Sequence, residues 1–152
     1  MLNYTTKVPA HQSIAEISKM LAKSGASAVM HEYDDAGNIK SLSFKMKFDG
    51  QDIGFRLPAN WQNIQIILVE MRRKNTKIPT FVVTDEHSLN VAWRVIKDWV
   101  EAQLALIEAN QAKTEQVFLP YAVTRNGQTL YEHIATNPQL LLGDGTVRGG
   151  DV

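Results

Sequence analysis

The sequence contains no cysteine, which excludes disulfide bonds, thiolate catalysis and cysteine-based zinc sites. No apolar run approaches the ~20 residues that are needed to span a bilayer. The N-terminal residues lack the apolar core of a signal peptide. The formal net charge is zero, so no field of the whole molecule attracts it to nucleic acid or to a membrane. We therefore expect a cytoplasmic protein that has no membrane partner.

Motifs that would indicate catalysis are missing as well. The chain has neither a G-x-S-x-G nor an S-x-x-K nucleophile motif, and it has no phosphate-binding glycine loop. None of its four histidines lies four residues from another, so a metal site would have to form entirely in three dimensions. We expect no enzyme activity, no cofactor and no metal. A deep pocket that joins His31 to Glu32 or Asp34 would reopen the question of an enzyme.

The chain is long enough for one well-packed domain. It has 152 residues, of which 44% are hydrophobic and 21% are charged, which are ordinary values for a globular protein. The last ten residues contain four glycines, which is typical of a flexible tail. We therefore expect a single domain over 1–142 and a flexible tail over 143–152.

The longest helical pattern covers Leu89 to Asn110. No glycine or proline lies between Asp85 and Gln116, and apolar residues recur every three or four positions in two adjacent stripes. This pattern predicts a helix that is buried on more than one side, in the core or in a homodimer interface. Thr84 or Asp85 is the expected N-cap, because a short side-chain oxygen can accept from the free N–H groups of the first turn.

The N-terminal part of the chain predicts a helix and three strands. Ser13 and Glu16 have the spacing of a capping box, and Gly25 suits the end of a helix, so we expect a helix over 13–24. Three strands follow, over 26–33, 39–48 and 51–57, and the last two alternate between apolar and polar residues. Asp49 and Gly50 form a tight-turn signal between them. These strands predict an antiparallel meander with one solvent-exposed face.

A second helix is expected after the N-cap Asn60. Its buried stripe contains Trp61, Ile64, Leu68 and Met71, and Ile66 and Val69 are expected to widen that stripe. Further on, 117–121 is predicted to be extended, and 129–135 to be a short helix or strand. The predicted class is α+β, in the order helix, three-stranded antiparallel meander, helix, long central helix and short C-terminal extension.

The positive and negative charges are distributed unevenly along the chain, although the formal net charge is zero. Residues 40–77 contain eight cations and three acids, a net charge of +5, whereas 78–152 contain five cations and nine acids, a net charge of −4. A polyphosphate backbone would be attracted to such a basic segment. The predicted nucleic-acid-binding residues are Lys45, Lys47 and Arg56 on the outer sheet face, Tyr33 as a stacking residue, and Arg72, Arg73, Lys74 and Lys77 as an extension of the track.

Two other interpretations of the basic segment stay open. A half-exposed sheet commonly carries lysine outward, where it discourages edge pairing, so the charges can be a solvated surface alone. The segment can also meet an acidic protein surface. In that case the apolar 117–121 segment is the expected contact, provided that it forms an exposed patch in the isolated protein. The first strand adds His31 and Tyr33 to the outer face if Val29, His31 and Tyr33 point outward.

Several stretches resemble a family of small uncharacterised proteins that are encoded by phages and integrated bacterial elements. They are VAWRVIKDWVEAQLALIEANQAKTEQVFLPYAV, GQTLYE, KSLSFKMKF and IGFRLPAN. The resemblance implies a bacterial host cytoplasm and carries no assigned activity or site residues. Small non-enzymatic proteins in that setting commonly handle DNA or block host defences. It therefore favours DNA or RNA as the partner, with inhibition of a host defence protein as the alternative.

The predicted element order is similar to that of two nucleic-acid folds, the double-stranded RNA-binding domain and the core of single-strand annealing proteins. Similarity of fold order does not establish function. The chain also departs from the first fold, because its second helix begins with NWQN instead of a lysine cluster, and the cations lie at the far end of that helix.

Overall fold

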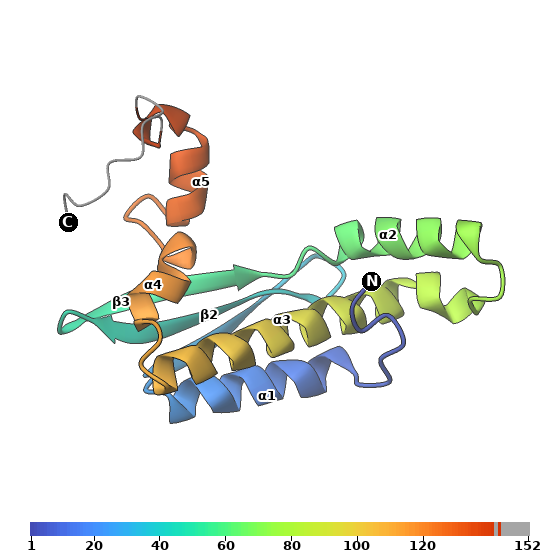
Figure 1. The fold of residues 1–152 in the computed structure, drawn as a ribbon, viewed down its shortest axis with the longest axis horizontal. Helices are drawn as coiled ribbons and strands as arrows, with labels where there is room; N and C mark the ends of the chain where they lie inside the picture. The colour runs from blue at the N-terminus through green and yellow to red at the C-terminus, as the bar shows by residue number, and fades with distance from the viewer. Residues whose placement is uncertain (142, 144–152) are drawn as a thin grey trace.

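The computed structural model describes residues 1–141 and 143. It shows an α+β fold in which an N-terminal helix precedes a three-stranded sheet and further helices follow (Figure 1). The predicted class and element order are confirmed. The elements are α1 (Ala10–Lys23), β1 (Ala28–Tyr33), β2 (Ile39–Phe48), β3 (Gln51–Pro58), α2 (Trp61–Lys74), α3 (Asp85–Glu108), α4 (Thr114–Phe118) and α5 (Leu130–Ala135), with short 3-10 helices at Thr80–Val83, Leu119–Tyr121 and Pro138–Leu140.

The sheet is an antiparallel meander in the order β1-β2-β3. Phe44 of β2 lies opposite Phe55 of β3, and their rings stack with centroids 5.2 Å apart. The turn between these strands places both Asp49 (φ 50°) and Gly50 (φ 79°) in the left-handed region, as a two-residue type I′ hairpin requires. The predicted bounds of β2 and the predicted turn are confirmed.

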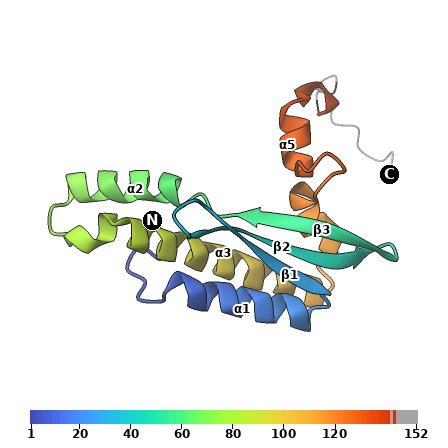
Figure 2. The same cartoon turned by 180° about the vertical axis from the view of Figure 1, so that it is seen from behind.

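Helices α1 and α3 cover one face of this sheet in both views (Figures 1 and 2). The core therefore lies between the sheet and these two helices, and Trp93 of α3 is fully buried in it. A second apolar cluster around Leu68, Val82 and Val91 joins α2 to the other end of α3. The prediction that α3 is buried on more than one side is confirmed. The predicted N-cap of α3 is confirmed too, because the side chain of Thr84 accepts from the backbone N–H of His87 at 3.2 Å.

The start of α1 differs from the prediction. The helix begins at Ala10, after Pro9, and no side chain caps its first turn. Ser13 lies inside the helix and is fully buried, whereas Glu16 contacts Arg94 of α3, with Oε2 and Nη1 2.8 Å apart. The predicted capping box is therefore wrong, because a tertiary ion pair uses the glutamate that local spacing had assigned to the helix end.

The Glu16–Arg94 pair makes a small, pH-dependent contribution to stability. Burial raises the pKa of Glu16, but hydrogen bonds from Gln12 and Arg94 and the positive charge of Arg94 outweigh it, so the pKa lies below the ordinary 4.5. A carboxylate with a lowered folded pKa stabilises the protein above its unfolded pKa, and this contribution is lost as the pH falls through the folded value.

We expect Glu16→Gln to lower the free energy of unfolding at pH 7 by about 0.5 kcal/mol, because both side chains are partly exposed and solvent screens the pair. Urea unfolding at several pH values measures the difference between variant and wild type, which should decrease as the pH falls below 4.5 and through the lowered pKa of Glu16. Glu108→Gln, at an exposed position, is the control. A difference that is constant from pH 7 to pH 3 would contradict the assignment.

Helix α2 packs against α3 and extends beyond the sheet (Figure 1). Its predicted buried stripe is confirmed in Ile64, Leu68 and Met71, which belong to the second cluster. The prediction that Ile66 and Val69 widen this stripe is wrong, since they are 67% and 50% exposed. The reason is that α2 lies beside α3 and covers no sheet face, so only one narrow stripe is buried.

The segment that follows α3 folds back onto the sheet. The prediction of an extended 117–121 is wrong: Thr114–Phe118 is helical, and Pro120 lies at the start of a 3-10 turn, where its missing N–H removes no helical hydrogen bond. Phe118 is fully buried. Farther on, Val123 N–H donates to the Gly54 carbonyl at 2.8 Å, so this segment lies against the outer edge of β3.

The C-terminal tail and the possibility of a membrane-spanning helix are the remaining features. The predicted flexible tail over 143–152 lies, apart from Gly143, outside the described residues. Within the described part of the chain, no helix has both the length and the apolar character that crossing a membrane requires.

Candidate nucleic-acid interface

One face of the sheet lies away from α1 and α3 (Figure 2). The burial pattern of β2 places Lys45 and Lys47 on this face. Alternation along β2 places both lysines opposite the core residues, and both are exposed. Lys45 lies between Ala28 of β1 and Gly54 of β3. These small neighbours leave the ammonium group of Lys45 accessible from above the sheet, so a phosphate group can approach it without displacing a larger side chain.

Lys47 is also exposed, but its ammonium group has a partner. Its side chain is 75% exposed, and its Nζ lies 3.8 Å from Asp52 Oδ1 on β3. An ion pair at this distance and exposure contributes little energy. The lysine is therefore available to a phosphate, which would compete with one solvated carboxylate.

Arg56 lies on the same face but is already held by the C-terminal segment. Its Nη2 donates to the Gly127 carbonyl at 2.8 Å and lies 3.6 Å from Glu132 Oε1. Arg125, which is exposed and two residues from Gly127, adds to this region a cation that is not among the predicted nucleic-acid-binding residues. No local pattern could have found it, because its place depends on a contact across 71 residues.

The first strand presents different residues to the outer face from those expected. Val29 lies opposite Phe44 and His31 opposite Leu42, so both point toward the helix-covered face, and the expectation that they point outward is wrong. Met30, which lies opposite Ser43, is outward and 58% exposed. An extra residue in β2, Lys40, makes a β-bulge opposite Glu32 and Tyr33, and Tyr33 lies opposite Ile39, which packs against the core. The expectation that Tyr33 points outward is therefore wrong as well, although its side chain is 60% exposed at the end of β1.

The basic cluster over 72–77 is not next to the lysines of the sheet. It lies at the end of α2, whereas the β2–β3 hairpin that follows Lys47 lies at the opposite end of the molecule (Figures 1 and 2). The structure thus separates the predicted track into two regions. Only a long ligand could contact both.

The charges of the 72–77 cluster are partly neutralised within α2. Arg73 makes two hydrogen bonds to Glu70, at 2.7 and 2.8 Å, and Lys74 Nζ lies 3.6 Å from the same carboxylate. The hydrogen bond from Arg73 lowers the pKa of Glu70, and the charge of Lys74 acts in the same direction. Glu70 is therefore ionised at neutral pH, which leaves Arg72 and Lys77 as the cluster residues that have no ion pair among residues 1–141 and 143.

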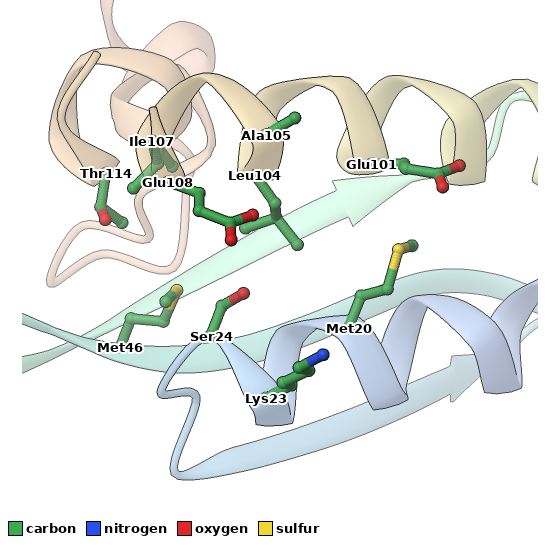
Figure 3. Close-up of a pocket in the computed structure, with 10 residues that line it drawn as sticks. All are labelled: Met20, Lys23, Ser24, Met46, Glu101, Leu104, Ala105, Ile107, Glu108 and Thr114. Atoms are coloured by element: carbon green, nitrogen blue, oxygen red, sulfur yellow. The ribbon is translucent and has the colours of Figure 1, made fainter. Parts of the chain in front are cut away.

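Hollows lie at different places on the surface, among them a small one of about 200 Å³ that Leu57 and Trp99 help to line. Two are larger. One has a volume of about 650 Å³ and opens between the C-terminal halves of α1 and α3, where Met20, Met46 and Leu104 line it together with Lys23 and Glu108 (Figure 3). It is on the helical side of the sheet and contains none of the predicted site residues. The other, of about 490 Å³, adjoins the outer sheet face near the start of α2 and includes Arg56.

His31 lines neither hollow, so the pocket that would have reopened the question of an enzyme is not found at these two places. Within the part of the chain that the structure describes, no group of three or more histidine, aspartate or glutamate side chains could hold a metal ion.

No protein-family model, curated protein or solved structure matches the chain. The resemblance to small proteins of phages and integrated elements therefore stays a prediction. Any functional conclusion has to come from the surface that the fold presents.

Proposed function

We propose that this protein binds nucleic acid, without catalysis, through the outer face of its sheet. The observation that carries the proposal is the open face around Lys45 and Lys47, which none of the helices in the described part of the chain covers and where small residues surround Lys45. Cations on an uncovered surface attract a phosphate backbone and release its counterions. The exposed Met30 on β1 supplies apolar surface on this face for contact with unpaired bases.

The cellular setting of this activity rests on the sequence resemblance. We place the protein in the cytoplasm of a bacterial host as the product of a phage or an integrated element. The ligand is DNA or RNA, and the order of elements gives no preference between a duplex and a single strand.

Charge reversal tests the proposed surface. The double variant Lys45→Glu/Lys47→Glu is expected to bind labelled DNA and RNA at least about tenfold more weakly. Its log–log dependence on salt should be shallower by about two, since each lost phosphate contact reduces the slope by about one. Fluorescence anisotropy with single- and double-stranded probes, from low to physiological salt, measures both quantities.

The control variant is Lys19→Glu/Lys23→Glu, which changes the net charge equally but on exposed positions of α1. It lies on the helical side of the sheet and should bind almost as well as the wild type. Equal losses in both double variants would mean that net charge alone drives binding. Absence of binding by the wild type at low salt would refute the proposed function.

A protein partner is the second candidate, and a specific observation favours it. Ile66, Val69 and Phe81 are 67%, 50% and 54% exposed on the part of the molecule that extends beyond the sheet, near the 72–77 cluster. Exposed apolar side chains with cations beside them are typical of a surface that meets an acidic partner. The 117–121 segment is the weaker candidate for such a contact, because Phe118 is buried in the isolated protein.

A further inference from the structure

The hollow near the start of α2 lies at one end of the proposed binding face. Glu32, Ser41 and Arg56 reach it from the three strands, and Lys40 and Trp61 border it. Its volume of about 490 Å³ is within the roughly 300–1,000 Å³ of small-ligand pockets. It is therefore large enough for a single nucleotide unit next to the exposed lysines of β2.

Ser41 is the unusual residue of this hollow. It is only 4% exposed, and its hydroxyl is buried without a hydrogen-bond partner in the part of the chain that the structure describes. Buried hydroxyl groups are almost always hydrogen-bonded, because leaving one unpaired is unfavourable. Ser41 also lines the hollow, and a rotation of its short side chain would bring this buried hydroxyl to the polar edge of a molecule that enters there.

The other side chains narrow the chemical class of that molecule. An inorganic anion would meet the carboxylate of Glu32. A metal ion would meet the cations of Lys40 and Arg56, and the carboxylate of Asp34 already accepts from the backbone N–H groups of Ala36 and Asn38, at 3.0 and 2.9 Å. A purely apolar ligand would leave these charges without partners.

A nucleotide can offer a binding partner to each of these side chains. Its base is a flat ring that can stack on the indole of Trp61, and its edge presents donors and acceptors to Glu32 and Ser41. Its phosphates can approach Lys40 and Arg56. A carboxylate can only accept hydrogen bonds, so Glu32 favours bases that carry an exocyclic amino group over uracil and thymine.

We propose that this hollow binds one unpaired nucleobase, with the ring on Trp61 and the polar edge against Ser41 and Glu32. Where the base belongs to a strand, the inference rests on the proposed function, and the protein then prefers single-stranded nucleic acid. A free mononucleotide has the same recognition chemistry, and the experiment separates these two sources.

The decisive variant is Ser41→Ala, compared with Ser43→Ala. Ser43 lies two residues away on the same strand and the same face, and it serves as the matched control. We expect Ser41→Ala to bind a labelled oligodeoxycytidine about threefold to tenfold more weakly, the effect of one lost hydrogen bond. Its melting temperature should be unchanged or raised, because an unpaired hydroxyl has been removed. Ser43→Ala should bind as the wild type does.

Two further comparisons test the base contacts. Trp61→Leu should weaken binding about fivefold or more through lost stacking. The wild type should prefer oligodeoxycytidine over oligodeoxythymidine, and Glu32→Gln should narrow this preference, because an amide can also donate to the carbonyl oxygens of thymine. Glu86→Gln, which changes an exposed carboxylate on α3, should leave the preference as it is.

The outcomes separate the two proposals. If the wild type binds strands in a salt-dependent manner but Ser41→Ala and Ser43→Ala bind equally, the base pocket is refuted and the proposed function stands. If no strand binds but cytidine monophosphate quenches tryptophan fluorescence in the wild type and not in Trp61→Leu, the pocket stands with a free nucleotide as its ligand. If neither ligand binds, both proposals are refuted.

Discussion

Replacing Trp93 by alanine is expected to lower the free energy of unfolding by about 3–5 kcal/mol, a large part of the roughly 5–15 kcal/mol of a typical domain. The side chain is completely buried between α3 and the sheet. Its Nε1–H donates to the Ile39 carbonyl at the start of β2 at 3.2 Å. The substitution therefore leaves a cavity and also leaves a backbone acceptor without its partner.

Two variants make this prediction specific. Trp93→Phe keeps most of the apolar area but loses the hydrogen bond, so it should cost about 1–3 kcal/mol. Leu106→Ala on the same helix changes a side chain that is 43% exposed and should cost less than about 1 kcal/mol. Urea unfolding of the three variants gives the comparison. Equal losses for Trp93→Ala and Leu106→Ala would contradict the placement of Trp93 at the centre of the core.

Sequence patterns predicted the elements whose structure depends on nearby residues. The alternation over 39–48 gave the bounds of β2, because a strand with one buried face has to repeat every two residues. Gly25 was correctly expected to end α1, and its φ of 106° shows why glycine is suitable there. The length and the two apolar stripes of the pattern over Leu89 to Asn110 predicted the long helix, which the structure shows at Asp85–Glu108.

The predictions were wrong for residues whose contacts are made by a distant part of the chain. Glu16 was assigned to a helix cap because its partner Arg94 is 78 residues away. Ile66 and Val69 fit a helical stripe equally well whether α2 covers a sheet or lies beside a single helix. Only the three-dimensional arrangement shows that it lies beside α3.

The residues of the candidate site also differ in whether the sequence alone could predict their surroundings. Lys45 and Lys47 could be assigned to the outer face because β2 is regular. The state of Arg56 could not be predicted, since Gly127 and Glu132 approach it only when the C-terminal segment folds against β3. The hollow at Ser41 was also beyond prediction, because it combines the ends of three strands with the first turn of α2.

The side chain of Phe118 anchors the C-terminal segment over 114–135 to the sheet. It is fully buried, and its ring centroid lies 5.3 Å from that of Phe44, 5.8 Å from that of Trp99 and 6.1 Å from that of Phe55. We expect Phe118→Ala to destabilise the protein by about 3–5 kcal/mol. Because the residue anchors a peripheral segment, part of this loss should be local unfolding of the segment over 114–135.

Hydrogen exchange measures this effect at the Val123 amide, which donates to Gly54, and at the amides of β2 for comparison. In Phe118→Ala the Val123 amide should lose protection by a larger factor than the β2 amides do. Leu119→Ala, at the neighbouring position that is 43% exposed, is the control and should change neither. Uniform loss of protection over the whole sheet would show that the segment and the sheet unfold as one unit. If only the segment over 114–135 unfolds, Gly127 and Glu132 no longer hold Arg56. The same variant then tests whether a free Arg56 increases the affinity of the sheet face for a phosphate backbone.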